Sequence, residues 1–547
     1  MSESLADLLG GRPHHGATNP LLFDRGRPLT AADFVAEAAR IAGGLGALGI
    51  ARGDRVAIWL PNVPAWLATF AALARLGAIA VAVNTRFRSQ ELAMILRRAE
   101  PRAMVYWPGF NGIDFAGILA DCDPAALTSI TWLIEYNEAD SPPTARHDVA
   151  VERAVERIDF AALPAVAVEA QPQASDANDS LPCILFSTSG TTKEPKLVLH
   201  DQRTLARHAH NVAAAWHLGP GSAVYLVPPL CGVYGFCTAL AALAGGAPLW
   251  MRPAWDAGAA AAEIVRGACT HITATDDIYA QLLATTPAQR PFPSLTYAGF
   301  APFNPALADI VAHAQARGLM LSGLYGTSEV QALFSVRMSD RAAAERSRAG
   351  GHPVSATAHV RARDPETGAI LPHGTNGALE ILAPESRMVG YFGNEDATAA
   401  SFTADGWYRT GDIGSTSADG SFVFLTRAGD SLRIGGFLVS PAEIENVIQE
   451  AGGIDACQVV AVPRPEGWRP VAFVIPEAGS EVDESRLSSH VRARLAPYKV
   501  PVRFLAIDAF PVTASANGTK IRKDVLRQIA LDALNGTGSL TSSQEVA

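Results

Sequence analysis

The order of apolar and polar positions between residues 30 and 100 predicts helices that alternate with strands. Residues 30–50 carry apolar side chains at helical spacing, and Thr30 is placed to cap the first turn. The short apolar run RVAIWL at 55–60 is typical of a buried strand, and residues 64–84 predict a helix that runs into another strand. This alternation favours a parallel sheet covered by helices.

The pattern changes twice farther along the chain. Residues 136–180 are polar and rich in Pro, Asp and Ser, which predicts a surface excursion. After residue 430, helical segments at 441–452 and 484–496 and apolar runs at 458–464 and 470–476 predict a small α+β unit. We therefore expect an α/β protein: a large N-terminal domain of helix-covered sheets (1–427), a small mobile α+β domain (428–535) and a disordered tail (536–547).

Composition narrows the class of protein. The chain has 547 residues, too many for a single core, and a formal net charge of -10 without a basic stripe, which argues against nucleic acid as a partner. Its six cysteines form no CxxC pair, and the N-terminus lacks the basic start and apolar core of a signal peptide. The most apolar stretch is interrupted by Arg75. We expect a cytoplasmic protein with no membrane span.

The stretch CILFSTSGTTKEPKLVLH at 183–200 has the form strand, Ser/Thr/Gly loop, strand. Glycines let the backbone come close to a ligand, and amide and hydroxyl donors can point at phosphate oxygens. A Walker A loop would open a helix, whereas a strand-like run follows here. By itself the stretch is either a phosphate loop, which we favour, or a polar surface hairpin.

Further segments follow in a fixed order: YGTSE at 325–329, GWYRTGDIG at 406–414, RAGDSLRIGGFLVSPAEIE at 427–445 and NGTKIRKDVLR at 517–527. With these motifs, residues 28–526 resemble the adenylate-forming superfamily of acyl- and aryl-CoA synthetases, luciferases and adenylation domains. Any one motif is a modest signal, but five in order form a strong one.

The resemblance implies an acid–CoA ligase. ATP and Mg²⁺ convert a carboxylic acid to acyl-AMP and pyrophosphate, and the thiol of coenzyme A then displaces AMP; such a site works by positioning and charge neutralisation. We expect an aromatic or otherwise compact acid. The main alternative is transfer to a separate carrier-protein thiol. A non-enzymatic nucleotide-binding relative and a luciferase-type oxidation are less favoured, and the oligomeric state, monomer or homodimer, stays open.

The resemblance also assigns nucleotide contacts. Tyr325 would stack on adenine, Thr327 would contact the α-phosphate and Asp412 would accept from the ribose hydroxyls. Glu329 would ligate Mg²⁺, although it could also be an ordinary acid in the first turn of a helix. The remaining nucleotide-binding residues implied by the motifs are Thr188, Ser189, Gly190, Thr191, Thr192, Lys196, Gly299, Ala301, Pro302, Gly326 and Arg427.

The small domain would carry the catalytic lysine. By resemblance this is Lys520, which bridges the substrate carboxylate and the α-phosphate, and Lys523 is its rival. Rotation of the domain would then bring the loop after the hinge to the site, with room for the pantetheine arm of CoA. For the hinge and this loop the motifs imply Gly429, Asp430, Gly435 and Gly436.

The chain departs from the family pattern at several places. Lys193 and Leu197 stand where the family often has glycine; Lys193 either adds charge for the triphosphate or is a solvated surface lysine. Gly429 replaces the usual Asp or Lys of the hinge. Phe300 replaces a glycine, and we expect it to narrow the acid pocket.

Two segments bear on the acid pocket, residues 228–240 and residues 273–283. Residues 233–235 resemble benzoate-type ligases, and the small residues before them either admit a ring substituent or only repack a helix start. One of Asp276 and Asp277 faces the pocket in the sharper hypothesis, whereas both cap a helix in the simpler one, which we favour. The expected pocket residues are Cys231, Gly232, Val233, Tyr234, Gly235, Asp276, Tyr297 and Phe300.

Overall fold

The computed structural model describes residues 4–10, 18–138, 155–164, 181–188, 195–301, 307, 309–337, 340–365, 367–427, 432–434, 437–439, 441–477, 479–515 and 518–535. At 426, 427, 433, 437, 438, 442, 512–515, 518–520 and 524 only the backbone is described. Most of the polar excursion at 136–180 lies outside these residues.

The N-terminal half is built on an 8-stranded sheet. From one edge to the other its strands are β19 (Gly390–Tyr391), β9 (Lys196–Asp201), β8 (Pro182–Thr188), β4 (Ile79–Ala82), β3 (Arg55–Trp59), β5 (Ala103–Tyr106), β6 (Trp132–Glu135) and β7 (Glu156–Asp159). The strands from β8 to β7 pair in parallel, as the βαβ pattern predicts, and β8 and β9 form the expected antiparallel hairpin.

A second sheet of 13 strands occupies the other half of the large domain. Its order is β17 (His359–Arg363), β18 (Gly377–Leu382), β20 (Tyr408–Thr416), β21 (Phe422–Arg427), β16 (Gly350–Pro353), β15 (Ser335–Val336), β14 (Leu321–Tyr325), β13 (Tyr297–Ala301), β12 (His271–Thr275), β10 (Val224–Leu226), β11 (Leu249–Met251), β1 (Pro20–Asp24) and β2 (Arg27–Thr30). The strands β1 and β10–β14 form its parallel part, whereas β15–β18, β20 and β21 are antiparallel.

Helices fill the space between the sheets and cover their outer faces. The helices of the large domain are α1 (Leu5–Leu9), α2 (Ala31–Ala47), α3 (Pro64–Leu76), α4 (Ser89–Ala99), α5 (Phe115–Ala120), α6 (Gln202–Ala215), α7 (Val233–Ala244), α8 (Ala257–Arg266), α9 (Asp276–Ala284), α10 (Ile310–Ala316), α11 (Ala343–Arg346) and α12 (Glu395–Ala400). The largest apolar core joins strands of both sheets through α2, α3, α6 and α7. Trp66 and Phe70 of α3 pack on Phe236 of α7 at its centre.

The helix start expected at Thr30 is present. Thr30 is the N-cap of α2, its hydroxyl accepts from the Asp33 N–H, and the Asp33 carboxylate accepts from the Thr30 N–H. This reciprocal capping box satisfies two backbone donors that the first turn would otherwise leave open.

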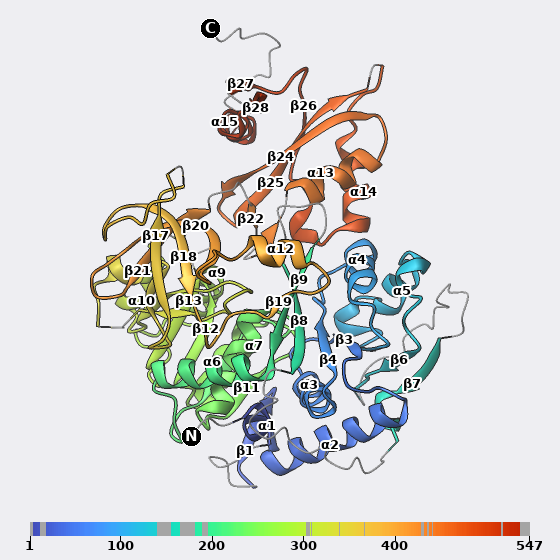
Figure 1. Ribbon diagram of the computed structural model, residues 1–547, viewed down its shortest axis with the longest axis vertical. Helices are drawn as coiled ribbons and strands as arrows, with labels where there is room; N and C mark the ends of the chain where they lie inside the picture. The colour runs from blue at the N-terminus through green and yellow to red at the C-terminus, as the bar shows by residue number, and fades with distance from the viewer. Residues whose placement is uncertain are drawn as a thin grey trace.

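The small domain lies at one end of the molecule, with α14 against α4 (Figure 1). It comprises β22 (Leu432–Ile434), β23 (Phe437–Val439), α13 (Pro441–Glu450), β24 (Ile454–Arg464), β25 (Gly467–Pro476), α14 (Glu484–Arg494), β26 (Phe504–Ala506), β27 (Val512–Ser515), β28 (Gly518–Ile521) and α15 (Lys523–Asn535). Its own apolar core packs α13 and α14 on β24 and β25. The expected helices and strands of this unit are therefore present, whereas its exact boundary at 427/428 stays a prediction.

Within the described part of the chain, no helix is both long and apolar enough to span a membrane.

Candidate functional site

A cavity of about 1590 Å³ opens between the two halves of the large domain and reaches the small domain. Strands β8, β9, β14 and β20 and the start of α7 contribute to its wall. Among the residues expected to bind nucleotide, the cavity is lined by Thr188, Lys196, Ala301, Tyr325, Gly326, Thr327, Glu329 and Asp412. Segments that are more than 200 residues apart in sequence therefore meet at one place.

Asp412 and Tyr325 form a buried pair in this cavity. The Tyr325 hydroxyl donates to Asp412 Oδ2 at 2.6 Å, and the Asp412 N–H donates to the Thr410 hydroxyl at 2.9 Å. Phe422 packs edge-on against the Tyr325 ring, with 5.1 Å between ring centroids. Tyr325, which we expect to stack on adenine, is thus hydrogen-bonded to Asp412, which we expect to bind ribose.

The chain after β14 turns sharply and carries Thr327 and Glu329 into the cavity. Residues 326–334 form turns and not a helix, so the alternative of a first-turn helix acid does not apply to Glu329. Gln331 and Leu333 both have a φ of 64°, a left-handed conformation that non-glycine residues rarely adopt and that must be held by surrounding contacts. We refer to residues 326–333 as the acid loop, after the side chain of Glu329 that it carries.

Two buried histidines hold the acid loop by its backbone. His200 Nε2 contacts the Ser328 carbonyl and His208 Nε2 contacts the Ala332 carbonyl, each at 2.7 Å. Because a carbonyl only accepts, the hydrogen lies on Nε2 in both rings. Burial lowers the pKa of both histidines, that of His208 to about 4, so both are neutral near pH 7.

Glu329 is buried, with only 9% of the residue exposed. Its carboxylate Oε1 accepts a hydrogen bond from the Tyr391 hydroxyl at 2.9 Å. The nearby Thr327 hydroxyl is buried and has no hydrogen-bond partner among the described residues. A buried acid beside an unsatisfied hydroxyl suits a hard cation held together with a phosphorylated ligand. Among the described residues, no cluster of three or more His, Cys, Asp or Glu offers a metal site made of protein alone.

Glu329 would therefore hold Mg²⁺ with the remaining ligands coming from phosphate and water, as is usual for this ion. Lys196, at the start of β9, places its ammonium 4.4 Å from the centroid of the Tyr391 ring. Of the Ser/Thr/Gly loop, Thr188 ends β8, whereas Ser189, Gly190, Thr191, Thr192 and Lys193 lie outside the described residues.

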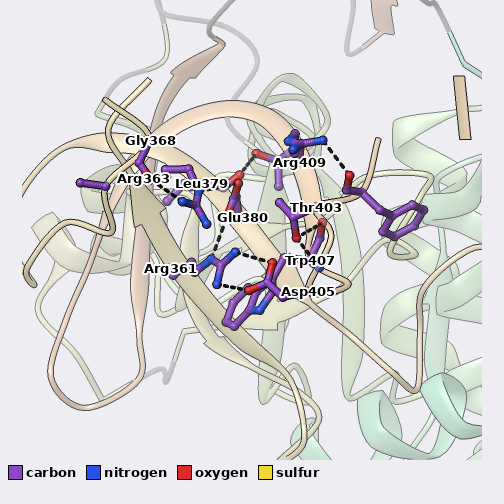
Figure 2. Close-up of polar contacts among 12 residues, drawn as sticks. Arg361, Arg363, Gly368, Leu379, Glu380, Thr403, Asp405, Trp407 and Arg409 are labelled. Carbon is purple, nitrogen blue, oxygen red and sulfur yellow. Dashed lines mark hydrogen bonds and ion pairs between the residues drawn. The ribbon is translucent and has the colours of Figure 1, made fainter. Parts of the chain in front are cut away.

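A network of ion pairs joins β17 and β18 to the turn just before β20, the strand that carries Asp412 (Figure 2). Glu380 of β18 accepts from Arg361 Nε at 2.7 Å and Arg363 Nε at 2.9 Å. Arg361 also pairs with Asp405 and stacks 4.2 Å from the Trp407 ring centroid. These contacts join β17 and β18 to Asp405 and Trp407, which lie just before β20.

The acid end of the cavity is formed by the start of α7 and the two residues before it. Cys231, Gly232, Val233 and Tyr234 line it, and the Tyr234 hydroxyl donates to the Ala274 carbonyl at 3.3 Å. Burial raises the pKa of Cys231 to about 11, so its thiol is protonated and forms part of a neutral wall. Apolar residues Leu333, Ile278 and Leu324 complete this end.

Several residues expected in the acid pocket lie elsewhere. Phe300 points to the opposite face of β13, into the core formed with α9 and α10, because side chains alternate along a strand; it does not narrow the pocket. Tyr297 packs on Trp216 with 4.9 Å between ring centroids, outside the cavity wall. Gly235 faces the Pro228 and Pro229 carbonyls, which a Cβ atom would meet at 2.4 and 2.3 Å.

The two aspartates at the start of α9 also differ from expectation. Asp276 is 1% exposed and its Oδ1 accepts from the Asp277 N–H at 3.0 Å, whereas Asp277 lines the cavity. Thr275, and not an aspartate, is the N-cap residue. Of the two acids, Asp277 is therefore the one placed to meet a substrate.

The small domain reaches the cavity through Lys499, which follows α14. Lys499 Nζ donates to Glu91 Oε1 of α4 at 2.5 Å and to Glu443 Oε1 of α13 at 2.7 Å, and all three side chains are largely buried. Burial raises the pKa of Glu91; the pKa of Lys499 also lies above its ordinary value, because its two carboxylate partners outweigh its burial. We refer to Lys499, Glu91 and Glu443 as the interdomain triad.

Other expected residues are placed by their backbone or not at all. Lys520 pairs with Thr513 in the β27–β28 hairpin, and Arg427 pairs with Asp412 across β20 and β21, but neither side chain is described. Gly299 lies on β13, and Pro302, Gly429, Asp430, Gly435 and Gly436 lie outside the described residues. Sequence reasoning did not find Tyr391, His200, His208 or Lys499, because nothing local marks them as neighbours of the cavity.

Comparison with known proteins identifies the class. The model of the AMP-binding enzyme family matches residues 12–392, and that of the AMP-binding enzyme C-terminal domain matches residues 443–517. The chain therefore belongs to the AMP-binding enzymes, which confirms the family and the fold class expected from its motifs.

The relatives that match along nearly the whole chain are named CoA ligases. A feruloyl-CoA synthase of Amycolatopsis is 30% identical over 513 residues, covering 92% of this chain and 94% of that protein. A long-chain-fatty-acid–CoA ligase of Mycobacterium tuberculosis is 30% identical over 506 residues, covering 91% and 93%. A sulfoacetate–CoA ligase of Cupriavidus necator is 28% identical over 519 residues, covering 93% and 95%.

Solved structures agree on the fold. An amide bond synthetase from Marinactinospora thermotolerans superposes with a TM-score of 0.78 at 24% identity, covering 96% of this chain and 99% of that one. The o-succinylbenzoate CoA synthetase of Bacillus subtilis gives a TM-score of 0.79 at 21% identity, covering 96% and 98%.

Proposed function

We propose that the protein is an AMP-forming acid–CoA ligase. One observation carries the proposal: a single cavity collects Lys196, Thr327, Glu329 and Asp412 beside a largely apolar wall. The first group of residues suits a Mg²⁺–triphosphate and a ribose, and the wall suits the body of an organic acid. The names of the full-length relatives support the same activity.

The reaction has two displacements. The substrate carboxylate attacks the α-phosphorus of ATP and pyrophosphate leaves, which converts a carboxylate oxygen into part of a good leaving group, AMP. The CoA thiol then loses its proton to water, its sulfur forms a bond to the acyl carbon, and the bond from that carbon to AMP breaks, so that AMP leaves. In the first step two anions approach each other, so the positive charge of Lys196, Lys520 and Mg²⁺ matters most in the transition state.

Each residue has a defined task in this proposal. Thr327 donates its hydroxyl to the α-phosphate, Asp412 accepts from the ribose hydroxyls and Glu329 holds Mg²⁺. Lys520, supplied by the small domain, bridges the two reacting anions. The bound ion would neutralise charge that develops between the phosphates.

The acid is an aromatic or otherwise compact carboxylic acid. The relatives' names range from feruloyl to sulfoacetate and long-chain fatty acids, so they do not select one. The neutral wall of Cys231, Gly232 and Tyr234 favours an aryl group, and Asp277 at its edge favours an amino or hydroxyl substituent.

The test is pyrophosphate release from ATP over a panel of acids, from short fatty acids to benzoate and its amino and hydroxy derivatives, with and without CoA. Sustained turnover that requires CoA supports the proposal. Release that stops near one equivalent in the presence of CoA would favour a carrier-protein acceptor instead.

Variants at two positions link the activity to this cavity. Glu329→Gln and Asp412→Ala should each lower kcat/KM for ATP by about 100-fold, because each removes a charged contact that the nucleotide or its ion requires. Asp405→Asn, at an exposed position in the turn before β20, is the control and should leave kcat/KM within about twofold.

A further inference from the structure

Tyr391 contacts two oppositely charged groups of the cavity, Lys196 and Glu329, at once. Tyr391 is the last residue of β19, a short edge strand beside β9 (Figure 1), where it pairs with Val198. The residue is 7% exposed. Its hydroxyl donates to Glu329 Oε1 at 2.9 Å, and its ring lies 4.4 Å from Lys196 Nζ. Both partners and Tyr391 itself line the cavity.

The two charges do not pair with each other. Lys196 and Glu329, both described with their side chains, form no ion pair within 4.0 Å. Glu329 is buried and Lys196 is partly buried, so water screens their mutual attraction less than it would at an exposed surface. A direct Lys–Glu pair would satisfy both groups and leave neither for a triphosphate or its cation.

Tyr391 gives each charge a neutral partner instead. The ring face attracts the ammonium through its quadrupole, and the hydroxyl donates to the carboxylate. A tyrosine hydroxyl ordinarily carries its proton near pH 7, so it acts as the donor to this carboxylate. The tyrosine is itself fixed, since its N–H donates to the Thr398 hydroxyl at 2.8 Å.

We propose that Tyr391 is a positioning residue that separates Lys196 from Glu329 and keeps both available to Mg²⁺–ATP. This inference rests on the proposed function of the cavity. It adds a residue outside the motifs described above, on β19, a strand of two residues.

Two substitutions separate the contribution of the Tyr391 hydroxyl from that of its ring. Tyr391→Phe keeps the ring and removes the hydroxyl, so we expect the apparent affinity for Mg²⁺ to fall about tenfold while ATP affinity at saturating Mg²⁺ stays within about twofold. Tyr391→Leu removes both contacts and the ring as a spacer, so both affinities should fall about tenfold or more.

The measurement is calorimetric titration of ATP at a series of Mg²⁺ concentrations, which needs neither the acid nor CoA. Tyr106→Phe is the matched control, because the Tyr106 hydroxyl also donates to a glutamate, Glu135, at 3.1 Å and lies outside the cavity wall. This variant should bind Mg²⁺ and ATP like the unmodified protein. If Tyr391→Phe and Tyr391→Leu both bind like the unmodified protein, or lose affinity equally, the inference is wrong.

A double-mutant cycle tests the spacer without any ligand. Lys196→Met and Glu329→Gln should be weakly coupled in their effects on the free energy of unfolding in the native background, because both residues contact Tyr391. Their coupling should be clearly stronger in the Tyr391→Leu background, where the two charges can meet. Equal coupling in both backgrounds would overturn the inference. An unmodified protein that binds no ATP at any Mg²⁺ concentration would instead refute the proposed function, and the cycle would still decide the role of Tyr391.

Discussion

Burial decides the chemical state of individual side chains around the cavity. His200 and His208 are fully buried, and each holds a backbone carbonyl of the acid loop with one ring nitrogen. Two residues of that loop adopt a left-handed backbone, which costs energy and persists only where neighbours hold it. The histidines are thus positioning residues for Thr327 and Glu329, and they act in their neutral form.

This predicts a pH dependence of stability. The pKa of His208 falls from 6.5 to about 4 in the folded protein, so between these values the unfolded chain binds more protons. The resulting stabilisation is complete above pH 6.5 and is lost as the pH falls to 4, an effect of about 3 kcal/mol.

His208→Gln keeps an N–H donor but cannot titrate. Urea denaturation from pH 4 to pH 8 should therefore show that the free energy of unfolding of the variant varies less over this window than that of the unmodified protein. His359→Gln, at an exposed position on β17, serves as the control. Identical pH profiles for the unmodified protein and His208→Gln would contradict the prediction.

At the scale of elements, an ion-pair network joins β17 and β18 to the turn that precedes β20, the strand that carries Asp412 (Figure 2). Glu380 is the hub: its side chain is 4% exposed and accepts from two arginines. Breaking a buried pair from one side leaves the partner charges uncompensated, which is costlier than losing an exposed contact. Asp405, whose side chain is 57% exposed, lies at the solvent-exposed end of the same network.

Glu380→Gln should therefore lower the free energy of unfolding by about 3 kcal/mol. Asp405→Asn should leave the denaturation midpoint nearly unchanged, because water already screens that carboxylate. Urea denaturation of both variants at pH 7 makes the comparison. Equal effects of the two substitutions would show that burial does not set the strength of this network.

At the scale of the whole molecule, the interdomain triad connects α4 of the large domain to α13 and to the segment after α14 in the small domain. A buried lysine between two carboxylates stabilises the one arrangement in which all three meet. If the small domain rotates between the two half-reactions, as the family resemblance implies, the triad favours the orientation seen here.

Glu91→Gln removes the half of the triad that crosses between the domains and leaves Lys499 paired with Glu443. We expect the ratio of the two half-reaction rates to change by about tenfold, because the variant shifts the balance of orientations. Pyrophosphate exchange measures the first rate and CoA-dependent AMP release measures the second. Glu484→Gln, whose partner Arg503 lies within the small domain, is the control. An unchanged ratio in Glu91→Gln would rule out a role for the triad in orientation.

Much of the fold and part of the site follow from local patterns. The βαβ texture, the capped helix at Thr30, the β8–β9 hairpin and the small α+β unit were all predictable, because helical and strand periodicities and capping residues act over a few neighbouring positions. The ordered motifs also identified the family, since each motif is a contiguous stretch. Which face a side chain takes was harder to predict: Phe300 was expected in the pocket but lies in the opposite core.

The sequence by itself thus determined the family, the order of elements and the candidate residues for nucleotide, cation and catalysis. Only the tertiary structure decided which of them share the cavity, that Asp277 and not Asp276 lines it, and that Tyr391 stands between Lys196 and Glu329. The reason is physical, because a motif specifies only a local conformation. A contact among residues 196, 329 and 391 depends on how distant strands pair and on which polar groups lose their contact with water when they are buried.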